Sequence, residues 1–183
     1  MDNIKNIVIG TIVTIIIGGT AYSVNQADIV KNFADDTGLT KEQAEQYIKE
    51  IPEEELVAWG ELGSYTINNG QELLKMAKEI DCINYEYEWE LLTSSCAEGK
   101  SQITKLARDW ISLGQSYIKL NSDSASESDI RETIQLIDQV NSDFQFEIIS
   151  GALDQPTIDE ERRANSYNKA TLKAVLDSYY KDN

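Results

Sequence analysis

The amino-terminal end of the chain carries a long apolar run, and this run limits what the rest of the chain can be. Residues 7–21 contain no charged side chain, and residues 4–24 contain only one, Lys5. A helix rises about 1.5 Å per residue, so residues 4–24 would span roughly 31 Å, about the thickness of a bilayer's hydrocarbon core. The sequence therefore predicts a transmembrane segment within residues 1–24, with membrane contact through residues 4–24.

Two other interpretations fit the same run. In a secretory signal peptide, Lys5 would be the basic start, residues 7–17 the apolar stretch, and Gly19, Thr20 and Ala21 the small residues of a cleavage site. The third interpretation is a buried core helix. The first two place the rest of the chain outside the cytoplasm, as the periplasmic or extracellular part of a single-pass protein or as a secreted protein.

Small residues recur within the run at a spacing that matters if it is helical. Gly10, Thr14 and Gly18 follow one another every four residues, which would place them on one helix face. Small side chains let two membrane helices approach closely, so this stripe predicts anchor packing and a homodimer through the anchor. The alternative is that Gly and Thr are simply common in membrane helices.

After the run, the spacing of apolar residues is helical almost throughout. A short helical hairpin is expected over residues 28–51, with Thr40 and Gln43 as a capping box. Four longer helices are expected over about residues 52–81, 103–120, 130–148 and 157–180, the first of them bent or broken near residues 68–70. The predicted fold class is all-α: an N-terminal transmembrane helix followed, over residues 25–183, by an extracytoplasmic antiparallel bundle of about four main helices plus the short hairpin.

The two cysteines constrain the path of the chain. Cys82 and Cys96 are the only thiols, and outside the cytoplasm two such residues are expected to form a disulfide, with two buried free thiols as the alternative. A straight helix across 14 residues would separate them by roughly 21 Å, whereas a disulfide needs Cα atoms within about 7 Å. Pairing therefore predicts that the chain turns back between them.

Between the cysteines lies a segment in which aromatic and acidic residues alternate. Its candidate partner contacts are Tyr85, Glu86, Tyr87, Glu88, Trp89 and Glu90. Tyrosine and tryptophan supply a large contact area at low entropic cost, so the segment predicts a protein contact site. Alternatively, the aromatics cap the bundle core and the glutamates are solvated. The pattern leaves open whether residues 83–91 are extended, helical or irregular.

The composition excludes several classes of site. The chain has no His, which removes histidine-based catalytic triads and dyads and histidine-ligated metals, and it contains no motif for a metal or other cofactor. The formal net charge of −16 argues against nucleic acid as a partner. No pair of carboxylates lies on an apolar face, and the acids at residues 53–55 and 159–161 are interpreted as solvated residues at helix starts. No catalytic residue is therefore assigned.

These expectations combine into one functional hypothesis. The sequence favours a membrane-anchored, non-enzymatic helical bundle that acts as an interaction or assembly module outside the cytoplasm. A charge of −16 favours a protein partner whose surface is basic or mixed. One alternative is a secreted or tethered inhibitor or immunity-type protein that masks a basic target, and another is an enzyme that uses only carboxylates and tyrosines.

Overall fold

The structure is a computed structural model that describes residues 12–51, 59–82, 96–145 and 155–181. These ranges contain a two-stranded sheet and six helices. The elements are β1 (Ile12–Ile17), β2 (Thr20–Asn25), α1 (Gln26–Thr37), α2 (Lys41–Glu50), α3 (Trp59–Glu79), α4 (Cys96–Leu120), α5 (Glu127–Asp143) and α7 (Gln155–Lys181). The chain is therefore mostly helical, as the periodicity predicts, with a small sheet that was not expected.

Several helix boundaries follow from capping residues. The Thr40 side chain accepts a hydrogen bond from the Gln43 backbone, and the Gln43 side chain accepts one from the Thr40 backbone, which confirms the capping box of α2. Ser126 and Asp129 form the corresponding box at the start of α5. The expected bend or break near residues 68–70 is absent, because α3 continues as one helix through Gly70.

The helix expected at the amino-terminal end is the main correction. Over the described residues 12–25 the chain forms an antiparallel hairpin in which Val13 pairs with Val24 and Ile17 with Thr20. The turn is made by Gly18 and Gly19, whose φ angles are 59° and 71°. Glycine occupies this left-handed region readily, and two such residues make a tight turn whose twist matches that of the strands.

The hairpin forms because its side chains alternate between two environments. Ile15 and Ile17 point toward the helices and are partly or fully buried, whereas Ile16 between them is 62% exposed. β-branched residues are stiff at χ1 and are better suited to strands than to helices. The turn is held in place by the Gly18 N–H, which donates to the Leu120 carbonyl at 2.9 Å. The expected stripe is thus not on a helix face, because Thr14 lies in a strand and Gly18 in a turn, while Gly10 is outside the described residues.

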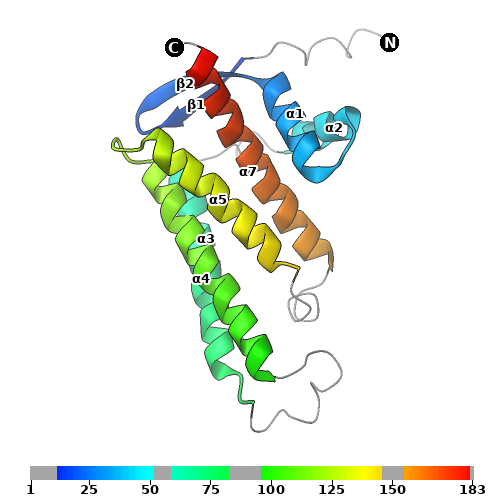
Figure 1. Ribbon diagram of the computed structural model, residues 1–183, viewed down its shortest axis with the longest axis vertical. Coiled ribbons are helices and arrows are strands. Elements are labelled where there is room, and N and C mark those ends of the chain that lie inside the picture. The colour runs from blue at the N-terminus through cyan, green and yellow to red at the C-terminus, as the bar shows by residue number, and fades with distance from the viewer. Residues whose placement is uncertain (1–11, 52–58, 83–95, 146–154, 182–183) are drawn as a thin grey trace.

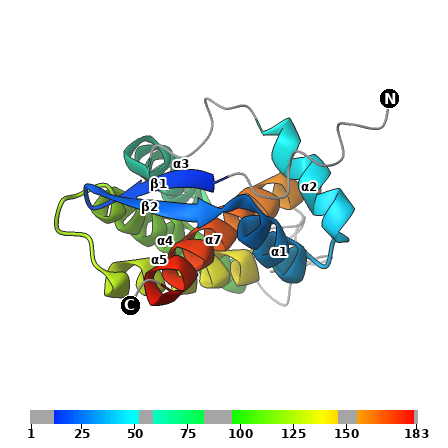
Figure 2. The same cartoon turned by 90° about the horizontal axis from the view of Figure 1, so that it is seen from above.

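The helices surround one apolar core that the hairpin helps to close. Figures 1 and 2 show α3 and α4 running antiparallel, α5 and α7 packed beside α4, and the hairpin lying across one end of these helices. Ile17 and Val24 from the hairpin, Phe33 from α1, Leu113 from α4 and Leu172 from α7 are all almost fully buried in this core. No helix in the described ranges is both long enough and apolar enough to cross a membrane.

Candidate functional site

Helices α3 and α4 form an arm in which the backbones lie unusually close. A Cβ atom placed on Gly63 would be 2.5 Å from the Gly114 carbonyl oxygen, and one placed on Gly70 would be 2.8 Å from the Ala107 carbonyl oxygen. Real Cβ contacts are not that short, so only glycine fits at these positions. The two helices therefore contact each other through their backbones at two positions one heptad apart, Gly63 and Gly70.

The far end of this arm carries the two cysteines. Cys82 and Cys96 lie at disulfide distance, with their Cα atoms 5.5 Å apart, so the predicted reversal of the chain between them is confirmed. The Lys100 ammonium also donates to the Ile80 carbonyl at 3.0 Å, which ties the last turn of α3 to the first turns of α4. The ends of both helices are thus fixed relative to each other where the intervening segment begins and ends.

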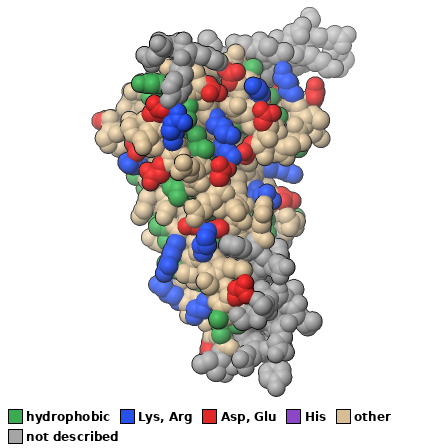
Figure 3. All heavy atoms as spheres, in the orientation of Figure 1, with side chains coloured by type: hydrophobic (Ala, Val, Ile, Leu, Met, Phe, Trp, Pro, Cys, Tyr) green, Lys and Arg blue, Asp and Glu red, His purple; other side chains and the backbone are tan. Residues whose placement is uncertain are grey.

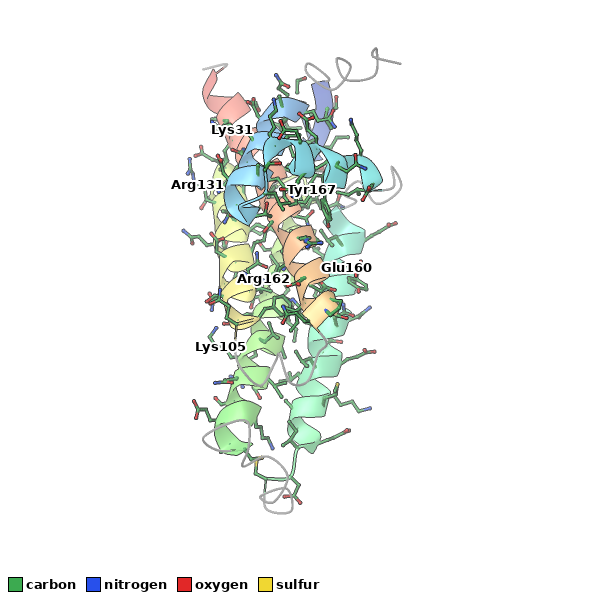
Figure 4. All side chains as sticks on the ribbon, turned by 90° about the vertical axis from the view of Figure 1, so that its right-hand side faces the viewer. Lys31, Lys105, Arg131, Glu160, Arg162 and Tyr167 are labelled. Carbon is green, nitrogen blue, oxygen red and sulfur yellow. A yellow bond between two sulfur atoms is a disulfide. The ribbon has the colours of Figure 1, made fainter. Side chains whose placement is uncertain are left out.

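The arm extends beyond the rest of the bundle. Figures 1 and 4 show that the end formed by the close of α3 and the start of α4 reaches past the nearer ends of α5 and α7. The candidate contact residues of the alternating segment, from Tyr85 to Glu90, lie outside the described residues. The structure therefore describes the two helices that flank this segment, which are close-packed and joined by the cysteine pair.

A second feature is a cavity of 180 Å³ between α3, α4 and α7. From α3 and α4 it is lined by Leu62, Tyr65, Thr66, Asn69 and Trp110, and from α7 by Thr157, Glu160, Glu161, Ala164, Asn165 and Asn168. Two carboxylates thus stand on the α7 wall, and two aromatic residues stand on the opposite walls. None of these lining residues is Lys or Arg.

The carboxylates of this cavity have no cation beside them. Within the described residues, neither Glu160 nor Glu161 forms an ion pair or a side-chain hydrogen bond. Glu161 is partly buried, and burial together with the neighbouring charge of Glu160 raises its pKa. The buried Tyr117 hydroxyl, which accepts a 3.5 Å hydrogen bond from Asn168, has its pKa raised by burial and, to a lesser degree, by the Glu161 charge.

The opposite side of α7 faces α1 and α5 and carries charges of both signs. Figure 4 shows Glu160 and Arg162 on opposite sides of the helix, the first toward α3 and the second toward α5. Arg162 and Arg163 line an open cleft of 440 Å³. Next to it Lys169 is only 8% exposed, and its ammonium pairs with both Asp36 and Asp138, so it joins α1, α5 and α7.

A carboxylate pair also occurs between α4 and α5, which the sequence did not predict. The Lys105 ammonium lies 2.8 Å from an Asp109 oxygen and 2.6 Å from an Asp143 oxygen, and Gln139 donates to Asp109 at 2.9 Å. Burial and the hydrogen bond that the protonated Asp143 carboxyl donates to Asp109 raise the pKa of Asp143 against the opposing effect of Lys105. The oxygens of this pair are already engaged by protein donors, which indicates a structural link between the helices.

Basic side chains are few but not evenly spread. Lys100, Lys105 and Arg108 lie on one exposed stretch of α4 beside Ser101 and Thr104. Figure 3 shows this group as blue side chains over the lower part of the molecule, where α4 leaves the rest of the bundle. These basic side chains lie beside Asp109, whose carboxylate pairs with Lys105, so this stretch carries charges of both signs.

No protein-family model, curated protein or solved structure matches this chain. Its function is therefore inferred from geometry and chemistry. The sequence analysis interprets Glu160 and Glu161 as solvated acids at a helix start. Glu160 is exposed, as expected, whereas Glu161 is partly buried on a helix that begins earlier, at Gln155. The sequence does contain a signal for the side of α7 that faces the cavity. Glu161 shares one helix face with Thr157, Asn165 and Asn168, at spacings of three and four residues.

Proposed function

We propose that the protein is a non-enzymatic interaction or assembly module that works outside the cytoplasm and contacts a protein partner through the end of the α3–α4 arm. The observation that carries this proposal is the arm itself. Its two helices are packed through Gly63 and Gly114 and joined at the far end by Cys82 and Cys96. An arm with so little freedom presents the segment that starts and ends there at a low entropic cost of ordering.

The chemistry of that segment supports a protein as the partner. Tyr85, Tyr87 and Trp89 alternate with Glu86, Glu88 and Glu90, which together offer apolar area and negative charge. Aromatic residues dominate the binding energy of many interfaces, and complementary charge speeds association. With a formal net charge of −16 in the whole chain, the partner surface is expected to be basic or mixed.

The proposed location is supported by the cysteine pair. Disulfides persist in oxidising spaces such as the periplasm or the cell exterior and are rare in the cytosol. In the described fold, residues 12–24 form the hairpin that covers one end of the core, so the location does not require them to span a membrane. Alkaline carbonate extraction of native membranes separates the tethered form, which stays with the lipid, from a form released into the supernatant.

The non-enzymatic part of the proposal is supported by the state of the carboxylates. Asp109 and Asp143 both accept hydrogen bonds from Lys105, and Asp109 also accepts one from Gln139, so protein donors already engage this pair, although Asp109 borders an open hollow on α4. A carboxylate pair that performs acid–base catalysis needs access to a substrate proton. This arrangement favours a structural role for the pair and gives no support to the enzyme alternative.

The test is site-specific photo-cross-linking in the native envelope with a photoreactive residue at position 87. We expect a discrete cross-linked partner. The cross-link should be lost when Tyr85, Tyr87 and Trp89 are all replaced by Ser. The cross-linker is placed at Glu88 for this comparison. The matched control is Tyr179→Ser, which removes a 44% exposed tyrosine from α7 and should leave the cross-link intact. An unchanged cross-link in the triple variant, with helicity preserved, would remove the segment as the contact.

A further inference from the structure

The cavity between α3, α4 and α7 brings together three kinds of group. Glu160 and Glu161 supply negative charge, Tyr65 and Trp110 supply aromatic surface, and the side chains of Asn69, Asn165 and Asn168 supply amide oxygens. No basic side chain lines the cavity. Its lining therefore has an excess of negative charge and of hydrogen-bond acceptors.

The negative charge of the lining is unfavourable to bury, and a positively charged ligand would offset this cost. A partly buried carboxylate loses hydration and gains nothing in return unless a cation or a hydrogen-bond donor is nearby. Glu161 has neither among the described residues, and burial raises its pKa. A ligand that brings a positive charge with N–H donors would restore the interactions that Glu161 loses on folding.

The size and walls of the cavity restrict the cation. Its volume is 180 Å³, and Leu62 and Trp110 give it an apolar side. A hard metal ion takes six to eight oxygen ligands, and no group of three or more acidic, cysteine or histidine side chains suited to a metal occurs in the described part of the chain. An alkylammonium fits better, because its three N–H donors match carboxylate and amide oxygens while its carbon chain contacts the apolar and aromatic walls.

We propose that this cavity binds an organic ammonium group carried on a short aliphatic chain, supplied either by a free amine or by a lysine side chain of another protein. The ammonium is held by Glu161 and Glu160 on α7, and the aliphatic chain lies against Tyr65 and Trp110 on the other walls. The inference does not depend on the function proposed for the arm, because a free amine can occupy the cavity of the isolated protein.

The experiment is isothermal titration calorimetry of the full chain with n-butylammonium, with 1-butanol as the neutral analogue and calcium chloride as the metal control. We expect saturable one-site binding of n-butylammonium only. Glu161→Gln should weaken it roughly tenfold or more, since hydrogen bonds to charged groups contribute about 1.5–3 kcal/mol. Glu132→Gln removes the same charge from an exposed position on α5 and should change the affinity less than twofold.

The outcomes that overturn the proposal are distinct from a loss of folding. Glu161→Gln replaces a carboxylate whose burial is unfavourable, so its far-UV circular dichroism should match that of the wild type and its melting temperature should be no lower. The proposal fails if n-butylammonium shows no saturable binding, if 1-butanol or calcium binds as well as the amine does, or if the folded Glu161→Gln variant binds as tightly as the wild type. Failure of the arm cross-link would leave these results unaffected.

The source of the ammonium is separated by comparing two further probes. A capped tripeptide Ala-Lys-Ala presents the group as a protein would, and 1,5-diaminopentane presents it as a free amine. Tighter binding of the peptide than of the diamine assigns the cavity to a lysine of a protein partner, and the reverse assigns it to a free amine. The same peptide with an Nε-acetylated lysine should not bind, because acetylation removes the charge, and binding of that peptide would contradict the proposal.

Discussion

Gly63 of α3 and Gly114 of α4 face each other so closely that a Cβ on either one would lie 2.5 or 2.6 Å from the other's carbonyl oxygen. The contact is reciprocal, and the neighbouring Ile67 and Ile118 side chains close over it from the two helices. Two backbones in such contact leave no room for either helix to shift. The pair therefore fixes the register of the arm from within, as the cysteines fix its far end.

The first prediction is that alanine at this crossing destabilises the protein. Gly114→Ala should lower the free energy of unfolding by about 1–3 kcal/mol, because the added methyl group would overlap the backbone of α3. Gly60→Ala on α3 is the matched control, since its Cβ would meet only the Asn121 amide at 3.2 Å, a side chain that can move. Urea unfolding measures both variants, and an equal effect of the two substitutions would contradict the close approach.

The second prediction concerns the cysteines. Replacing both Cys82 and Cys96 by Ser should lower the unfolding free energy by about 3 kcal/mol, because the crosslink closes a short loop in the unfolded chain. Reduction of the wild type should give the same loss. Thiol labelling of the native protein under denaturing, non-reducing conditions should find no free sulfhydryl, and two labelled cysteines would show that the pair is not formed in the native protein.

The sequence was sufficient for the helices and insufficient for the first strands. Periods of three and four residues located α1 to α5 and α7 because each of these helices buries one face against a neighbour. Over residues 12–25, the length and apolarity of the run favoured a transmembrane helix and outweighed the local signal for a turn. That signal was the pair Gly18–Gly19, which directly follows the β-branched run of residues 12–17 and is typical of a hairpin turn. Only the packing of Ile17 and Val24 against the helices decides between a transmembrane helix and a β-hairpin.

The third prediction follows from the positive φ angles of that turn. Gly19→Val should destabilise the protein, because a β-branched residue is strained at a φ of 71°, whereas Gly19→Asn should be nearly neutral, because asparagine tolerates this region. If residues 12–25 formed a helix instead, neither substitution would introduce this strain, and the order of stability of the two variants would differ. Thermal unfolding compares the two, and equal melting temperatures would argue against the turn.

The cavity shows a different limit of sequence reasoning. Asp159, Glu160 and Glu161 follow one another, and a run of acids near a helix start is usually solvated. Which acid turns inward depends on where the helix begins and on what covers it. Because α7 starts at Gln155, Glu161 reaches the face shared with Asn165 and Asn168, while Asp159 accepts a hydrogen bond from Gln155 on another side.

The fourth prediction is a pH dependence of stability centred on Asp129. Hydrogen bonds from Lys119 and from Ser126 lower its pKa to about 2, compared with about 3.9 in an unfolded chain. Because the folded pKa is the lower one, the stabilisation is complete above about pH 4 and is lost as the pH falls toward 2. Urea unfolding of the wild type and Asp129→Asn should therefore differ most near neutral pH and converge near pH 2, and a difference that does not depend on pH would contradict this prediction.

The fifth prediction isolates the two causes that act on Glu161. Burial and the charge of Glu160 both raise its pKa, so Glu160→Gln should lower that pKa without returning it to the usual value, because burial remains. The buried Tyr117 of α4 also interacts with Glu161, and its raised pKa keeps it neutral over the range in which a carboxyl titrates. Carbon-detected NMR titration of the Glu161 carboxyl measures the shift. An unchanged pKa would mean that burial alone sets it, and the two carboxylates would then be too far apart to hold one ammonium between them.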